Sequence, residues 1–122
     1  MSCSAQNFNK ITYKAHTRGS AIGIEVQGNK ITYHTTQNKR VLTLSKQQLN
    51  RLNGIIEANN LKEIQTLKAP TNERYSDGAL IANFIIKIKD KKYTSSTFDA
   101  GNPPKELKNL EHILYDLTKL KE

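Results

Sequence analysis

Hydrophobic and polar residues alternate along the first third of the chain. This two-residue period is typical of strands with one buried face, and it recurs at 11–17, 22–26, 31–35 and 41–44. Gly28 and Asn29 lie between the second and third stretches, and a Gly-Asn pair between two strands favours a tight hairpin turn. The pattern therefore predicts a four-stranded β-meander.

A helical period replaces the alternation after Ser45. Serine is a good N-cap, and Gln48 follows three residues later, where its side chain completes a capping box. Hydrophobic residues then recur at helical spacing, at Leu49, Leu52, Ile55 and Ile56. Gly54 costs this helix about 1 kcal/mol relative to alanine, and we interpret it as a point of close approach to the sheet. A shorter apolar stripe predicts one more helical turn at Leu61, Ile64 and Leu67.

Two further strands are predicted in the second half of the chain. Residues 79–89 form its longest β-prone stretch. Ile81 and Ile85 make the second face of this stretch apolar as well, so we expect it to be central in the sheet. Residues 93–98 are polar and β-prone, and predict a returning strand.

The last helix is predicted from position 102 onward. Asn102 is expected to cap it, and Pro103 and Pro104 fill its first positions, where a missing N–H costs nothing. An apolar stripe follows at Leu107, Leu110, Ile113, Leu114, Leu117 and Leu120.

The predicted order is four strands, a helix, two strands and a helix (ββββ-α-ββ-α). Runs of antiparallel strands with helices between them indicate an α+β fold, in which a meander-containing antiparallel sheet carries two helices packed on one face. A length of 122 residues fits one domain. We place this domain at 10–122, after a flexible N-terminal tether at 1–9.

An excess of positive charge limits the kinds of partner. The chain has 19 lysines and arginines against 11 aspartates and glutamates, a net charge of +8, and most of the excess lies in residues 1–60. Lysine outnumbers arginine by 15 to 4, although arginine is the better bidentate ligand of phosphate and guanine. We therefore expect a solvated surface, or a face for an acidic protein or an anionic membrane, before nucleic acid.

The beginning of the chain predicts a location. Cys3 is the single cysteine, so neither an intramolecular disulfide nor a paired-cysteine zinc site can form. A lone cysteine before a short polar stretch resembles the mature start of a bacterial lipoprotein, whose cysteine carries the lipid. We expect a periplasmic or outer-membrane lipoprotein whose signal peptide is absent from this chain; the alternative is a cytoplasmic protein with an exposed cysteine. No apolar run reaches the roughly 18 residues of a membrane-spanning helix.

The common catalytic motifs are missing from the sequence. There is no G-x-S-x-G nucleophile turn, no H-E-x-x-H zinc motif and no glycine-rich phosphate loop. His16 and His34 are expected on neighbouring strands, but two histidines without an acidic ligand make a poor metal site. His112 and Asp116 are four residues apart on the last helix, and we interpret them as a surface pair. We predict no catalytic residue, no cofactor and no metal.

Two loops hold the most notable group of polar residues. Arg74, Tyr75 and Asp77 precede the 79–89 strand, and Asp99 and Asn102 follow its predicted partner. The start of one hairpin strand and the end of the other lie at the same end of a sheet, so the two loops are expected to be neighbours. Either Arg74 pairs with Asp77 or Asp99 to fix the loops, or the group forms a recognition patch.

The element order and the F-D-x-G-x-P-P-K-E-L motif at 98–107 resemble a known family. It is a small α+β domain of unknown function, found in secreted proteins and lipoproteins of Gram-negative bacteria. The matching residues are Arg74, Asp77, Gly78, Tyr93, Ser95, Phe98, Asp99, Gly101, Pro103, Pro104 and Leu107. The resemblance covers most of residues 10–120; it implies an envelope location and supplies no active site.

These observations together predict a non-enzymatic envelope lipoprotein domain. We expect it to bind another protein, within a larger outer-membrane assembly, and to associate with the membrane through a lipid on Cys3. One alternative is a periplasmic inhibitor of a hydrolase that acts through loops 70–78 and 98–104. An enzyme with an unrecognised site at those loops and a cytoplasmic nucleic-acid binder are the others.

Overall fold

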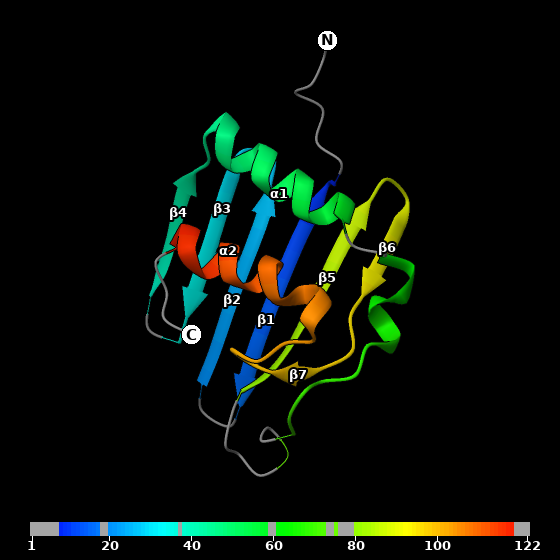
Figure 1. Cartoon of the computed structure of the whole chain (residues 1–122). Helices are drawn as coiled ribbons and strands as arrows, with labels where there is room; N and C mark the ends of the chain where they lie inside the picture. Colours follow the sequence, from blue (N-terminus) through cyan, green and yellow to red (C-terminus); the bar gives the residue numbers. More distant parts are fainter. Residues whose placement is uncertain are drawn as a thin grey trace.

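The chain folds into one sheet with helices on one side (Figure 1). The computed structural model describes residues 8–17, 20–36, 38–58, 61–72, 75 and 80–118. Within these residues the strands are β1 (Lys10–Thr17), β2 (Ser20–Gln27), β3 (Lys30–Thr35), β4 (Lys39–Thr43), β5 (Ile81–Ile88), β6 (Lys91–Thr94) and β7 (Phe98–Asp99). Their order is β4-β3-β2-β1-β5-β6, with β7 also paired to β5, and every pairing is antiparallel.

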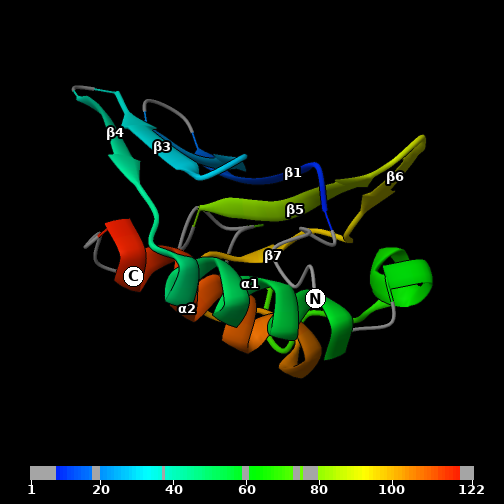
Figure 2. The ribbon, with the colours of Figure 1, turned by 90° about the horizontal axis from the view of Figure 1, so that it is seen from above.

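Two α-helices cover a single face of this sheet (Figures 1 and 2). They are α1 (Lys46–Ala58) and α2 (Lys108–Thr118), and the shorter 3₁₀ helices are η1 (Leu61–Thr66) and η3 (Lys105–Leu107). The predicted α+β fold, with its meander and its two helices on one face, is therefore confirmed. Among the described helices, none has the length and hydrophobicity needed to cross a membrane.

The hydrophobic core lies between the sheet and the helices. In β1 the odd-numbered residues Ile11, Tyr13 and Ala15 are buried, while the even-numbered residues lie on the opposite face. Helices α1 and α2 close the core with Leu52, Ile56, Leu110, Ile113 and Leu114, and the 3₁₀ helix η3 adds Leu107. Each fully buried aliphatic side chain stabilises the fold by about 1.5–3 kcal/mol.

Two local predictions are confirmed at the level of hydrogen bonds and backbone angles. The Gln48 backbone N–H donates to Ser45 Oγ at 3.2 Å, and the Ser45 N–H donates to Gln48 Oε1 at 2.8 Å, which is a reciprocal capping box. Gly28 has a φ of +63° in the turn that joins β2 to β3. Glycine adopts this left-handed conformation without a steric penalty.

The predicted role of Gly54 is wrong. A Cβ built on Gly54 meets nothing within 4 Å, and the residue is exposed on α1. The buried contacts of α1 come from Leu52 and Ile56, on the side of the helix that faces the sheet.

The predicted cap at Asn102 is also wrong. Gly101 has a φ of +87° and turns the chain sharply, so that the Asn102 N–H donates to the Asp99 carbonyl oxygen at 2.9 Å. The helical turns begin later, at η3, whose N-terminal flanking residue is Pro104 and which has no side-chain cap.

The predicted strand 93–98 is divided in two. Between β6 and β7, the Ser95 N–H donates to the Phe84 carbonyl oxygen, and the Phe84 N–H donates to Ser95 Oγ, both at 2.8 Å. The serine hydroxyl replaces a backbone acceptor at this point and interrupts the ladder. Strand β5 is an interior strand as expected, paired with β1 on one edge and with β6 and β7 on the other.

Candidate binding face

The structure describes only some of the residues that the sequence predicts to be functional. Cys3, Arg74 and Asp77 lie outside the described residues, and Tyr75 is 74% exposed. Asp99 is 1% exposed, so its carboxylate belongs to the interior of the protein.

Contacts at Thr71 show that the two loops meet. The Thr71 hydroxyl donates to Asp99 Oδ2 and accepts a hydrogen bond from Asn102 Nδ2 at 2.9 Å. The start of β5 pairs with β7, with Ile81 opposite Asp99. Residues 71 and 99–102 are therefore neighbours, and the bonds of Asp99 hold the loop that precedes β5 against the end of β7.

A second polar group is buried under the sheet and was missed by the sequence analysis. The Tyr13 hydroxyl donates to Glu111 Oε2 at 2.6 Å, and the Gly101 N–H donates to the same oxygen at 3.0 Å. The Tyr13 and Tyr115 oxygens are 2.9 Å apart, and since the Tyr13 proton is directed to Glu111, Tyr115 donates. Glu111 is 1% exposed and follows Leu107 at helical spacing on the buried stripe, which is the pattern that could have revealed it.

The environment of Tyr13 suits a structural donor. Burial, with the neighbouring Glu111 carboxylate and Tyr115, raises the pKa of the Tyr13 hydroxyl far above its ordinary value of 10.0. Tyr13 therefore keeps its proton and its hydrogen bond at all ordinary pH values. The group ties β1 to α2 and to the turn at Gly101.

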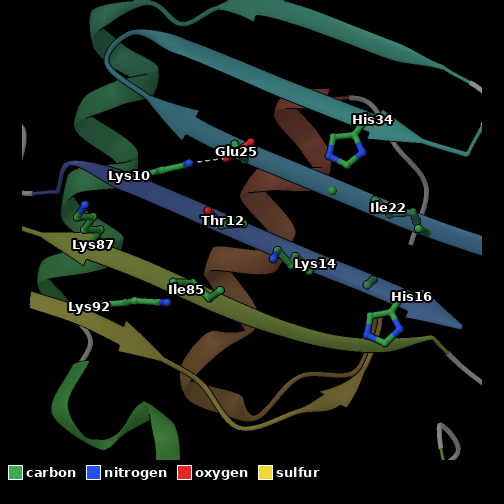
Figure 3. A pocket seen from close by; sticks show the side chains of 13 residues that line it. Lys10, Thr12, Lys14, His16, Ile22, Glu25, His34, Ile85, Lys87 and Lys92 are labelled. Carbon is green, nitrogen blue, oxygen red and sulfur yellow. Dashed lines mark ion pairs between the residues drawn. The ribbon is translucent and has the colours of Figure 1, made fainter.

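The opposite face of the sheet is hollowed, and none of the described helices lies over it. We call this the uncovered face; it is formed by the outward side chains of β1, β2, β3, β5 and β6 (Figure 3). Its hollow has a volume of about 620 Å³. The outer strand β6 rises away from the helical layer, and both helices lie behind the sheet (Figures 2 and 3).

Three lysines stand side by side on the uncovered face. Lys10 of β1 is directly opposite Lys87 of β5, and Lys87 is directly opposite Lys92 of β6. We call these residues the lysine row. Like charges directly opposite one another on adjacent strands are destabilising, so the free protein carries an electrostatic cost at this row.

Among the residues that the structure describes, Glu25 is the single acidic one that lines the hollow. Its Oε1 lies 2.7 Å from Lys10 Nζ, and the two side chains are 36% and 38% exposed. Within the described part of the chain, Lys87, Lys92 and Lys14 form no ion pair. The uncovered face therefore holds an uncompensated positive charge over an otherwise neutral floor of Thr12 and Ile85.

His34 lies on the backbone of Gly23, its cross-strand neighbour. A Cβ on Gly23 would lie 2.4 Å from His34 Nε2, so the absence of a side chain at Gly23 lets the imidazole rest there. The prediction that His16 and His34 lie on neighbouring strands is wrong, because β2 lies between β1 and β3. The described residues contain no group of three His, Cys, Asp or Glu side chains placed to hold a metal ion.

No family model matches this chain, and a search of curated proteins finds no match. The residues and geometry of the uncovered face are therefore what indicates a function.

Proposed function

We propose that this protein is a non-enzymatic binding module that holds another protein on the uncovered face of its sheet. The observation that carries the proposal is the hollow of about 620 Å³ with its row of three opposed lysines. Antiparallel sheets often leave one face in water, usually with polar residues along it. Here the half-buried Ile85 and the uncompensated lysines add an apolar floor and a charge that a partner can complement.

A protein partner fits this face better than a nucleic acid. Proteins that bind single strands on a sheet stack the bases on aromatic side chains. The strand aromatics Tyr13, Tyr33, Phe84 and Phe98 are buried in the core, and Tyr93, opposite the buried Ile86, is partly buried against the same core. No Phe, Tyr, Trp or Arg lines the hollow within the described ranges of the chain.

The location in the bacterial envelope is a further part of the proposal, and it depends on Cys3. A lipid on Cys3, followed by a short polar segment, would hold the domain close to a membrane surface. Mass spectrometry of the native full-length product tests this part: a lipid adduct on Cys3 is expected. An unmodified Cys3 would refute the envelope location and leave the binding face standing.

Site-specific photocrosslinking in living cells tests the binding face. A photoreactive residue is placed at Thr12 or Thr32, on the uncovered face, and as a control at Asn109, which is exposed on α2. We expect the same covalent adduct from Thr12 and Thr32 and none from Asn109. Equal adducts from all three positions, or none from the face, would refute the proposal.

A crosslinker at Tyr75 distinguishes the hydrolase-inhibitor alternative. Tyr75 is 74% exposed and belongs to the loop at 70–78 that the alternative requires. An adduct formed from Tyr75 and absent from Thr12 would favour an inhibitor that acts through its loops.

A further inference from the structure

We infer that the partner presents an acidic, extended segment to the lysine row, and that Glu25 stays ion-paired with Lys10 until this segment binds. The inference rests on the proposed function and deepens it by naming the chemistry of the partner. Both parts follow from the distribution of charge across three adjacent strands.

The lysine row carries more positive charge than its single acidic neighbour compensates. Adjacent strands are about 4.8 Å apart, so the Cα atoms of the three opposed lysines lie within about 10 Å of one another. Glu25 compensates Lys10, at 2.7 Å. Lys87 and Lys92 are exposed and have no ion-pair partner within the described residues, so two carboxylates from outside can be accommodated beside the existing pair.

The shape of the hollow favours an extended ligand. In an extended segment, side chains on one face recur about every 7 Å, a spacing that long lysine side chains can follow. The hollow continues beyond the row past Thr12 and Ile85 as far as His34. A single phosphate would fill only a small part of about 620 Å³. A flat anionic membrane would meet the rim of the hollow before its floor, so an acidic polypeptide is the ligand that matches both charge and shape.

Glu25 occupies the position beside Lys10 that a carboxylate of the partner would take. Glu25 lies opposite Thr12, two residues along the strand from the lysine row, and its side chain reaches Lys10 diagonally. Glu25 competes with the partner for Lys10 and repels its carboxylates. Its removal should therefore tighten binding, an effect opposite to that of removing a lysine.

The test measures peptide affinity by fluorescence anisotropy at low salt. The probe is a labelled peptide of alternating Glu and Val, about ten residues long, which spans the sheet at about 3.3 Å per residue; a Gln-Val peptide is its control. Lys87→Gln and Lys92→Gln should each weaken binding by about two- to fivefold, the range typical of exposed ion pairs. Glu25→Gln should strengthen it by a similar factor. The matched controls Lys105→Gln and Glu106→Gln lie exposed on η3 and should change nothing.

Several results would overturn the inference. Weaker or unchanged binding in Glu25→Gln would refute the competing role of Glu25. If Thr12 crosslinks a partner in cells but no lysine variant changes peptide affinity, the proposed function stands and the acidic segment is refuted. Tighter binding of oligothymidylate, of inorganic phosphate or of phosphatidylglycerol-containing vesicles, with the same dependence on Lys87, would assign the face to that ligand instead.

Discussion

Replacing Tyr13 by phenylalanine removes one oxygen from the interior and tests the buried polar group directly. The Tyr13 hydroxyl donates to Glu111 Oε2 at 2.6 Å, and Tyr13 is fully buried. A hydrogen bond to a charged group contributes about 1.5–3 kcal/mol, and the buried Glu111 carboxylate would keep its desolvation cost without it. We therefore expect Tyr13→Phe to lower the free energy of unfolding by about 2–3 kcal/mol, and the melting temperature by roughly 10 °C.

The assay is urea unfolding followed by circular dichroism, with Tyr33→Phe as the matched control. Tyr33 is 8% exposed on β3 and makes no hydrogen bond from its hydroxyl among the described residues. Its variant should stay within about 0.5 kcal/mol of the original protein. If Tyr13→Phe and Tyr33→Phe cost the same, the stabilising role of the bond to Glu111 is refuted.

We also predict that the difference in stability between the original protein and Tyr13→Phe depends on pH. The pKa of Tyr13 is raised by burial in the folded protein, while in the unfolded chain it has its ordinary value near 10.0. Below that pH both states keep the proton, so stability is unaffected; above it only the unfolded chain loses the proton. The free energy of unfolding should then fall by about 1.4 kcal/mol per pH unit from Tyr13 alone. The advantage of the original protein over Tyr13→Phe should shrink above pH 10, and parallel profiles up to about pH 11 would contradict this.

Three smaller changes test local features of the fold. Ser45→Ala should cost about 1 kcal/mol in urea unfolding, because the capping box is lost; an unchanged midpoint would show that the box adds nothing. Gly54→Ala should add up to about 1 kcal/mol, because the position is exposed and open, and destabilisation would restore the close-approach interpretation. Gly23→Ala should move the His34 ring, whose atoms lie 2.4 and 2.5 Å from the added Cβ, and shift its imidazole resonances in NMR spectra while the fold persists. Unshifted resonances would refute the stacked position of the ring.

Much of the fold could be predicted because its rules are local. Alternation defined the meander, Ser45 and Gln48 defined the start of α1, and Gly28 defined a hairpin turn, each within a few residues of sequence. Two features that were not predicted depend on partners far away in the sequence. Ser95 interrupts a strand through Phe84, and Glu111 is buried because Tyr13, 98 residues earlier, donates to it.

The uncovered face likewise combines local features, which the sequence predicts, with long-range features, which it does not. The period of β1 alone places Lys10, Thr12 and Lys14 on a single face. The lysine row itself depends on the register of β1 against β5 and of β5 against β6, which joins segments far apart in the chain. The period of each strand predicts which side chains lie on this face, but the pairing of the strands determines which charges are adjacent.

The position of β1 has a consequence for the order of folding. Strand β1 ends at Thr17, and one of its two edges is filled by β5, which begins only at Ile81. During synthesis the hairpins of β1 to β4 can form early, because their contacts are close in sequence. Until β5 emerges, one side of β1 remains an open edge that another chain could pair with. The strand at the centre of the finished sheet is thus an edge strand for as long as the nascent chain lacks β5.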